Sequence, residues 1–322
     1  MRAASFDHYG APEVVTVVDL PDPVPAAGEV LVRVEAACVT SADVAARSGN
    51  PFAIRMVIGL ARPRQRVLGT EFAGTIAAIG TDVTRFAVGD RVVAASGASF
   101  GAHAELVTVA ESGALAKIPD DVPLADALAI SEGALTALPF LRDHARLAAG
   151  QRILINGASG SVGTAAVQLA KLFGAHVTAV CSAANAELVT SLGADRVIDY
   201  GTEDFTRGPD RFDVIFDVVG GSTYGRSRRV LAAGGIYLTT VPDPRIVVDR
   251  MRARMLGQPA RLALTGLRKD ADKRVDLEWL LPLIADGTLV AVIDSRYPLE
   301  RVADAHARVD TRRKRGAVLL EP

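Results

Sequence analysis

Hydrophobic and polar positions alternate over short stretches in the first third of the chain, between closely spaced glycines and prolines. Stretches of this kind, rich in β-branched residues and bounded by turn formers, predict strands. We expect strands at residues 2–6, 14–19, 30–37, 72–79 and 91–94. Short strands joined by turns predict a compact antiparallel β domain, a partly open barrel.

The pattern changes beyond residues 119–123, where short apolar runs alternate with helical periodicity. Helices are expected at 164–173, 186–192 and 275–285, and strands at 152–156, 176–181, 196–199, 214–218 and 236–241. This alternation predicts a parallel sheet with helical crossovers. The stretch 245–270 fits a helix and an edge strand. The tail, 290–322, predicts a strand, a helix and a final strand that return to the β domain.

The length of 322 residues suggests two domains, at roughly 100–200 residues each. We place one at residues 1–122 and 288–322, and the other at 123–287. A formal net charge of −1 favours no nucleic acid, anionic membrane or strongly charged substrate. Two distant cysteines, Cys38 and Cys181, support neither a disulfide framework nor a four-cysteine zinc site. The N-terminus has no apolar signal core, and no uncharged run is long enough to span a membrane, so we expect a cytoplasmic protein.

A glycine-rich turn lies between the strand 152–156 and the helix after it. Its glycines are three residues apart, and the turn consists of Gly157, Ala158, Ser159, Gly160, Ser161, Val162 and Gly163. Such a turn brings backbone N–H groups and a helix N-terminus against a pyrophosphate, where side chains would obstruct it. We therefore predict a dinucleotide site; a merely tight strand–helix turn is the simpler alternative.

The end of the second strand of this domain distinguishes the two nicotinamide dinucleotides. NAD enzymes usually place an Asp or Glu there to hold the ribose 2′-hydroxyl. Here the strand runs into Ser182 and Asn185 with no acid between them, and both can donate hydrogen bonds to a 2′-phosphate. The sequence therefore favours NADP(H).

Several motifs in order resemble the medium-chain dehydrogenase/reductase superfamily, and within it the zinc-independent quinone oxidoreductase and enone reductase branch. They are GEVLVRV at 28–34, VLGTEFAG at 67–74, VGDRV at 88–92, GAHAE at 101–105, LTA at 135–137, LGAD at 192–195 and DVIFDVVG at 213–220. The resemblance covers the whole chain. It implies a GroES-like β domain, a Rossmann domain, nicotinamide hydride chemistry and a homodimer.

The resemblance also implies roles for single residues. The positions that match 2′-phosphate contacts are Ser182, Asn185, Tyr200 and Arg312, and those that line the cofactor are Thr136, Val219 and Val241. Relatives usually have a Lys or Arg at or beside Asn185, where this chain has Ala184 and Asn185. Arg312, in the run RRKR, could compensate for the missing charge.

No metal is expected. Zinc-dependent alcohol dehydrogenases of the superfamily have a Cys at the position of Thr40 and a His at that of Thr70, and threonine is a poor zinc ligand. Without a Lewis acid for an alkoxide, an already activated quinone or α,β-unsaturated carbonyl is the easier hydride acceptor. The reduced oxygen then needs hydrogen bonds and a proton. Candidate donors are the hydroxyls of Thr40 and Ser41, the nicotinamide ribose hydroxyl and water.

Other functions fit the same motifs. An NADP(H)-binding redox sensor or structural protein would show the same glycine-rich turn. An enoyl-reductase module of a larger synthase and an NADP-dependent alcohol dehydrogenase without zinc are further alternatives.

Overall fold

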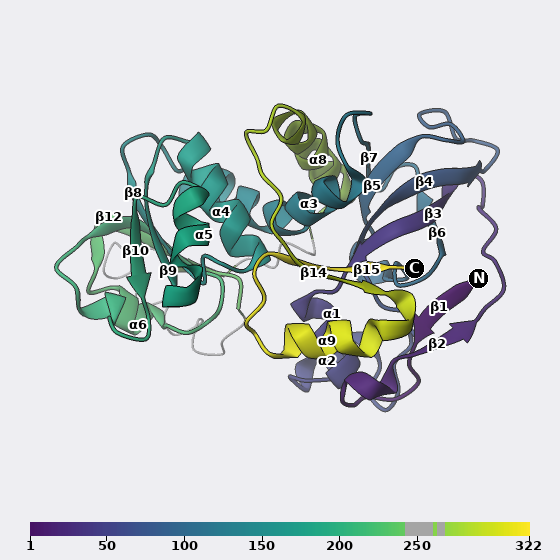
Figure 1. Ribbon diagram of the computed structural model, residues 1–322, viewed down its shortest axis with the longest axis horizontal. Coiled ribbons are helices and arrows are strands. Elements are labelled where there is room, and N and C mark those ends of the chain that lie inside the picture. Colours follow the sequence, from purple (N-terminus) through teal and green to yellow (C-terminus); the bar gives the residue numbers. More distant parts are fainter. Residues whose placement is uncertain (242–259, 263–267) are drawn as a thin grey trace. The chain divides into compact units, whose positions relative to one another are not determined.

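The computed structural model describes residues 1–241, 260–262 and 268–322. The chain divides into two compact units, each described here by itself (Figure 1). Unit 1 contains Met1–Glu132 and Gly266–Pro322, and unit 2 contains Gly133–Thr265. These boundaries differ from the expected ones because helix α8 (Asp270–Ala285) packs against strands β5 and β7 of unit 1. Most of the stretch 245–270 lies outside the described residues.

Unit 1 is built on a mostly antiparallel sheet with the strand order β14-β15-β3-β4-β5-β7, and β6 pairs with β3. Its strands are β3 (Glu29–Cys38), β4 (Glu71–Ile79), β5 (Arg91–Ala95), β6 (Leu106–Ala110), β7 (Ala114–Lys117), β14 (Ile293–Pro298) and β15 (Ala317–Glu321), with a separate pair β1 (Arg2–Ser5) and β2 (Thr16–Asp19). The tail returns to this sheet, as expected.

Strand β3 organises unit 1. Its residues alternate between buried and exposed as far as Glu35, which explains why the hydrophobic pattern predicts it. Its first half pairs with β6 and its end, at Ala37 and Cys38, pairs with β15. A strand that changes partner along its edge lets the sheet curve, and the GroES-like fold expected from the resemblance is confirmed.

Helices close the ends of the unit 1 sheet. Two of them follow β3 directly, α1 (Ser41–Ser48) and α2 (Ala53–Ile58), and the sequence analysis did not predict either. Helix α9 (Val302–Asp310) packs on α1, β14 and β15. The apolar residues between them include Phe6, Leu68 and Leu299, all buried.

Unit 2 is a parallel sheet with the strand order β10-β9-β8-β11-β12-β13. The strands are β8 (Arg152–Asn156), β9 (His176–Cys181), β10 (Arg196–Asp199), β11 (Phe212–Asp217), β12 (Leu231–Thr239) and β13 (Ala260–Leu262). In chain order this is the Rossmann arrangement 3-2-1-4-5-6, which has a switch point between β8 and β11. The predicted doubly wound fold is confirmed, and β13 supplies the expected edge strand.

Helices α4 (Ser161–Leu172), α5 (Ala186–Ser191) and α6 (Tyr224–Ser227) connect these strands, and α3 (Leu124–Pro139) leads from unit 1 into unit 2. Small residues permit close approach where α3 meets the start of α4: a β-carbon on Gly133 would lie 2.2 Å from the Ser161 carbonyl oxygen. Together with the π-helical turn η3 (Phe140–Ala145), α3 is long and apolar enough to cross a membrane, but 72% of that window is buried inside the protein. Core helices of water-soluble proteins pass the same test, so this is weak support for a membrane span.

Candidate functional site

The glycine-rich turn of unit 2 joins β8 to α4 at the switch point of the sheet. Backbone N–H groups of Gly157 and Ala158 donate to the Val180 carbonyl oxygen at the end of β9, at 3.0 and 3.1 Å. Gly157 has φ 87°, a left-handed conformation that glycine adopts without strain. Helix α4 then begins after Gly160, so its first N–H groups lie at the carboxyl edge of the sheet, where α/β folds bind ligands.

The three glycines of this turn meet different surroundings. A β-carbon on Gly157 would lie 2.4 Å from Val219 Cγ1, and one on Gly163 would lie 2.2 Å from the Gly157 carbonyl oxygen. These two glycines therefore allow the backbone itself to pack. At Gly160 the nearest atom would be 3.8 Å away, so this position faces open space at the N-terminus of α4. The turn thus fits a pyrophosphate group, which needs bare N–H groups and room above them.

The structure brings two of the predicted cofactor residues together. The Asn185 side-chain amide donates to the Ser159 hydroxyl at 2.9 Å, although 26 residues separate them. The other amide atom of Asn185, Oδ1, is buried and has no hydrogen-bond partner among the described residues. Ser182 is half-buried and Tyr200 is 65% exposed.

A buried carboxylate holds the neighbouring loops at the same edge of unit 2. Asp217, fully buried at the end of β11, accepts hydrogen bonds from three backbone N–H groups and two side chains. The donors are the N–H groups of Val219, Gly220 and Ser222, the Asn156 amide and the Tyr237 hydroxyl. This network fixes the loop that carries Val219. Sequence reasoning did not single out Asp217, although a charged residue ending a buried strand is a usable signal.

The three cofactor-lining predictions also fall in unit 2. Val241 packs close to Gly220, since a β-carbon there would lie 2.9 Å from Val241 Cγ1. Val219 is 53% exposed, so it is available to contact a ligand. Thr136 lies partly buried on α3.

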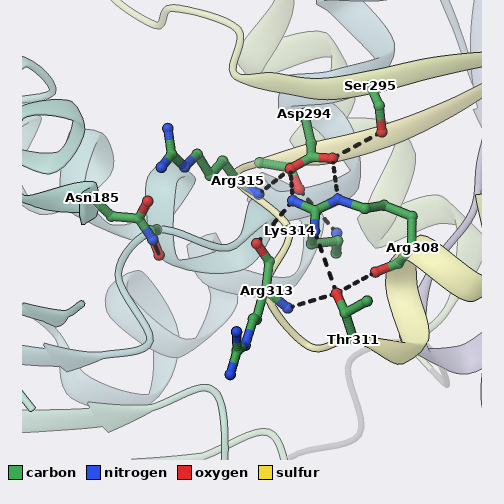
Figure 2. A network of polar contacts seen from close by, with 10 residues as sticks. Asn185, Asp294, Ser295, Arg308, Thr311, Arg313, Lys314 and Arg315 are labelled. Atoms are coloured by element: carbon green, nitrogen blue, oxygen red, sulfur yellow. Dashed lines mark hydrogen bonds and ion pairs between the residues drawn. The ribbon is translucent and has the colours of Figure 1, made fainter. Parts of the chain in front are cut away.

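The basic segment 312–315 belongs to unit 1. An ion pair between Arg308 and Asp294 holds its backbone in place (Figure 2). Arg308 donates to both carboxylate oxygens of Asp294, at 2.6 and 2.8 Å, and to the Arg313 carbonyl oxygen at 2.9 Å. Asp294 also accepts from the Arg315 backbone N–H at 2.7 Å. Burial raises the pKa of the Asp294 carboxyl, but the hydrogen bonds from Arg308 and Arg315 outweigh it, and the pKa lies below its usual value. The segment is therefore a fixed loop.

Arg312 is the first residue of this loop. Its φ of 55° is left-handed, which is uncommon for a residue with a side chain, and the residue is exposed. The Arg308 and Asp294 contacts on either side of it stabilise that conformation. The guanidinium group is thereby presented outward from unit 1.

Thr40 and Ser41, the predicted proton donors, lie where β3 ends and α1 begins. The Thr40 hydroxyl accepts from the N–H groups of Ala42 and Asp43 and donates to Asp43 Oδ2 at 2.7 Å. This is a capping box that starts α1. The Thr40 hydroxyl, predicted to donate a proton to the substrate, thus donates its hydrogen bond to Asp43. Ser41 is exposed.

Asp43 also links Thr40 to the second threonine considered in the sequence. Its Oδ1 accepts from the Gly69 backbone N–H at 2.9 Å, and its Oδ2 accepts from the Thr40 N–H at 2.8 Å. The carbonyl oxygen of Thr70, the next residue, accepts from the N–H and hydroxyl of Ser96. Asp43 therefore connects the two backbone segments that carry these threonines.

The side chain of Thr70 is hydrogen-bonded to the carboxyl group of Glu71. Burial raises the pKa of Glu71 to about 8, the Thr70 hydrogen bond opposes this, and the negative charges of Glu132 and Asp43 add to it. Glu132 Oε2 is itself buried without a hydrogen-bond partner among the described residues. Sequence reasoning considered Thr70 only as a poor zinc ligand and missed its pairing with Glu71.

Comparison with known proteins agrees with this geometry. Residues 26–120 match the alcohol dehydrogenase GroES-like domain, and residues 192–320 match the zinc-binding dehydrogenase family. The chain is 32% identical over 334 residues to the chloroplastic quinone-oxidoreductase QR1 of Triphysaria versicolor, covering 100% of this chain and 98% of that protein. The chain belongs to the medium-chain dehydrogenase/reductase superfamily, in its quinone oxidoreductase branch.

Other members of the superfamily resemble the chain along its whole length. The 2-methylene-furan-3-one reductase of Solanum lycopersicum is 32% identical, with 100% of this chain and 79% of that protein covered. The crystal structure of Escherichia coli quinone oxidoreductase complexed with NADPH superposes with a TM-score of 0.86 at 26% identity, covering 100% of both chains.

Although one matching family of this superfamily is described as zinc-binding, the part of the chain that the structure describes shows no suitable metal cluster. No group of three or more His, Cys, Asp or Glu side chains there could hold a metal ion. The chain is an oxidoreductase of this superfamily.

Proposed function

We propose that this oxidoreductase uses NADPH to reduce a quinone or an α,β-unsaturated carbonyl compound without zinc. The observation that carries the proposal is the glycine-rich turn of unit 2, where Gly160 faces open space at the N-terminus of α4. Relatives described as quinone oxidoreductases and as an enone-type reductase support the two acceptor classes. The Escherichia coli structure with NADPH supports the cofactor.

The residues of this chain fit NADP(H). Gly157 to Gly163 would hold the pyrophosphate, and the donors Ser182 and Asn185 replace the acid that NAD enzymes use for the ribose. When bound, the nicotinamide supplies a hydride. The protein's own groups then bind the acceptor, exclude water and provide a proton to the oxygen that gains charge.

Zinc independence rests on the residues at the family's ligand positions. Thr40 caps α1 and Thr70 pairs with Glu71, so both side chains have other partners. Threonine hydroxyls are also poor ligands for Zn²⁺, which prefers thiolate, imidazole or carboxylate.

The test is to follow NADPH and, separately, NADH oxidation with a set of acceptors. The set contains 1,4-benzoquinone, 9,10-phenanthrenequinone, an alkyl enone, an enal and a saturated ketone, each with and without a chelator. We expect NADPH oxidation with quinones or enones and no effect of the chelator. Preference for NADH, or loss of activity with the chelator, would refute the cofactor or the zinc-free part of the proposal. NADPH binding without turnover would favour the sensor alternative.

A further inference from the structure

Thr40 and Thr70 of unit 1 each donate a hydrogen bond to a neighbouring carboxyl group, but the surroundings of the two carboxyl groups differ. Asp43 accepts hydrogen bonds from the Thr40 N–H, the Thr40 hydroxyl and the Gly69 N–H. Hydrogen bonds from backbone N–H groups favour the charged form of a carboxyl group. Asp43 therefore holds the Thr40 proton, and this hydroxyl has none to release.

The carboxyl group beside Thr70 lies in a different environment. Glu71 receives a hydrogen bond from the Thr70 hydroxyl, and the charge of Glu132, whose Oε2 is buried without a hydrogen-bond partner among the described residues, acts on it. Loss of solvent contact and the nearby negative charges raise the pKa of Glu71 to about 8, so this group keeps its proton at neutral pH. A protonated Glu71 can donate to the Thr70 oxygen, which leaves the Thr70 hydroxyl proton available in another direction.

We propose that Thr70 and Glu71 form a proton relay to the oxygen of the reduced acceptor. This inference rests on the proposed function. After the acceptor has taken up two electrons and one hydrogen as hydride, its oxygen carries a negative charge. The Thr70 O–H bond breaks and a new O–H bond forms on that oxygen. Thr70 takes the carboxyl proton of Glu71, and Glu71, left as a carboxylate, regains a proton from water.

Hydrogen bonds and strand pairing hold Thr70 and Glu71 in fixed positions. Ser96 binds the Thr70 carbonyl oxygen twice, and Glu71 begins β4 in the middle of the unit 1 sheet, between β3 and β5. Thr70 is 8% exposed, so only a small part of the residue is in contact with water. Glu71 is partly exposed, which provides a route for reprotonation.

The charged and titratable groups around Glu71 set the pH range of the relay. They are Glu132 on α3, Asp43 on α1, Lys273 on α8 and the buried thiol of Cys38 on β3. Burial raises the pKa of Glu71 to about 8, and the two acids raise it while Lys273 lowers it. Above that pH the carboxylate holds the Thr70 proton inward, as Asp43 does for Thr40. The rate of proton delivery therefore falls as the pH rises through about 8.

Glu71→Gln tests the relay, because glutamine can still donate to Thr70 but carries no transferable proton. We expect kcat for NADPH and 1,4-benzoquinone to fall by about 100-fold, within the range for lost acid catalysis. The wild-type decline above pH of about 8 should be absent from the variant. Thr70→Val should match this loss, and Thr70→Ser, which keeps the hydroxyl, should restore most of the rate.

A second threonine–glutamate pair, between β4 and β3, is a matched control. The Thr75 hydroxyl donates to Glu35 at 2.7 Å, but this pair is exposed. Glu35→Gln and Thr75→Val should leave both kcat and its pH profile unchanged. Glu132→Gln should move the decline to lower pH, because it removes one negative charge that raises the pKa of Glu71.

A measurement on the protein without cofactor gives an independent readout. Infrared difference spectra between acidic and alkaline pH should show the C=O band of a protonated carboxylic acid that is lost at a pH of about 8. The band should be missing in Glu71→Gln and present in Glu35→Gln.

The outcomes separate the relay from the proposed function. Wild-type protein that oxidises NADPH with a quinone, together with a Glu71→Gln variant of equal rate and equal pH profile, would overturn the relay alone. A titrating band that persists in Glu71→Gln would also overturn it. Wild-type protein that reduces no acceptor would overturn the proposed function and the relay with it.

Discussion

Replacing Gly160 or Gly163 of the unit 2 turn by alanine should have different effects. The first change should weaken NADPH binding, and the second should lower stability. Gly160 has φ −78° and ψ 172°, and a β-carbon there would have no atom nearer than 3.8 Å. Alanine therefore fits the backbone, but its methyl group would occupy the space in front of the N-terminus of α4. On Gly163, a β-carbon would lie 2.2 Å from the Gly157 carbonyl oxygen and 2.7 Å from Ala158 Cα. Those atoms are backbone and cannot rotate away.

These β-carbon distances allow the effects on stability and on NADPH binding to be estimated. In Gly163→Ala the contact must open from 2.2 Å to at least 3.0 Å, which moves the turn against α4. Overpacking of this kind costs about 1–3 kcal/mol. For a chain of this size each 1 kcal/mol lowers Tm by about 2–4 °C. Gly160→Ala loses only the N-cap preference of glycine, a cost below about 1 kcal/mol, but it should weaken NADPH binding at least tenfold, or about 1.4 kcal/mol.

Gly208→Ala is the matched control, because Gly208 has φ −68°, ψ 163° and no atom nearer than 3.7 Å, away from the turn. Thermal unfolding by circular dichroism gives Tm without ligand, and fluorescence titration gives the Kd for NADPH. We expect Gly160→Ala to change Kd and Gly163→Ala to lower Tm. Unchanged NADPH binding in Gly160→Ala would refute the placement of the pyrophosphate at this turn. An unchanged Tm in Gly163→Ala would refute the steric argument.

Three further changes test other parts of the site. Tyr237→Phe removes one hydrogen bond to the buried Asp217 and should lower the free energy of unfolding by about 1–2 kcal/mol, measured by urea denaturation. Thr40→Val removes the N-cap of α1 and should cost about 0.5–2 kcal/mol in the same assay, with Thr40→Ser near wild type. Arg312→Gly suits the backbone at φ 55°, so Tm should stay within about 2 °C of wild type, while KM should rise for NADPH and not for NADH. An equal rise for both cofactors would show that Arg312 does not read the 2′-phosphate.

The fold could be predicted in most of its parts because its signals are local. The runs at 152–156 and 176–181 are buried strands, and the glycines between them require one particular turn. Helices α1 and α2 were missed because they are short, although the capping box of α1, between Thr40 and Asp43, is a local signal in the sequence. The boundary at residue 287 differed because α8 has its packing partners in unit 1, which periodicity does not reveal.

Most of the cofactor residues could also be predicted from the sequence. Some follow from the glycine-rich turn and others from the end of the second strand. Gly157 to Gly163 follow from the chemistry of a pyrophosphate at a helix N-terminus. Ser159 and Asn185 were named independently, one from the turn and one from the strand end, and the structure joins them by a hydrogen bond. Asp217 was missed because its role comes from five donors that only the folded sheet assembles.

Which threonine delivers the proton could not be predicted from the sequence alone. Thr40 and Thr70 are the same residue type, each lies close to an acid in sequence, and each occupies a position where relatives with zinc have a ligand. What distinguishes them is the surroundings of their acids: Asp43 accepts hydrogen bonds from two backbone N–H groups, whereas Glu71 lies near Glu132, whose Oε2 is buried without a hydrogen-bond partner among the described residues. Backbone donors stabilise a carboxylate, whereas a second buried acid disfavours it. The hydroxyl with a proton to give is therefore the one whose acid lacks such donors, and that can be decided only from the folded arrangement.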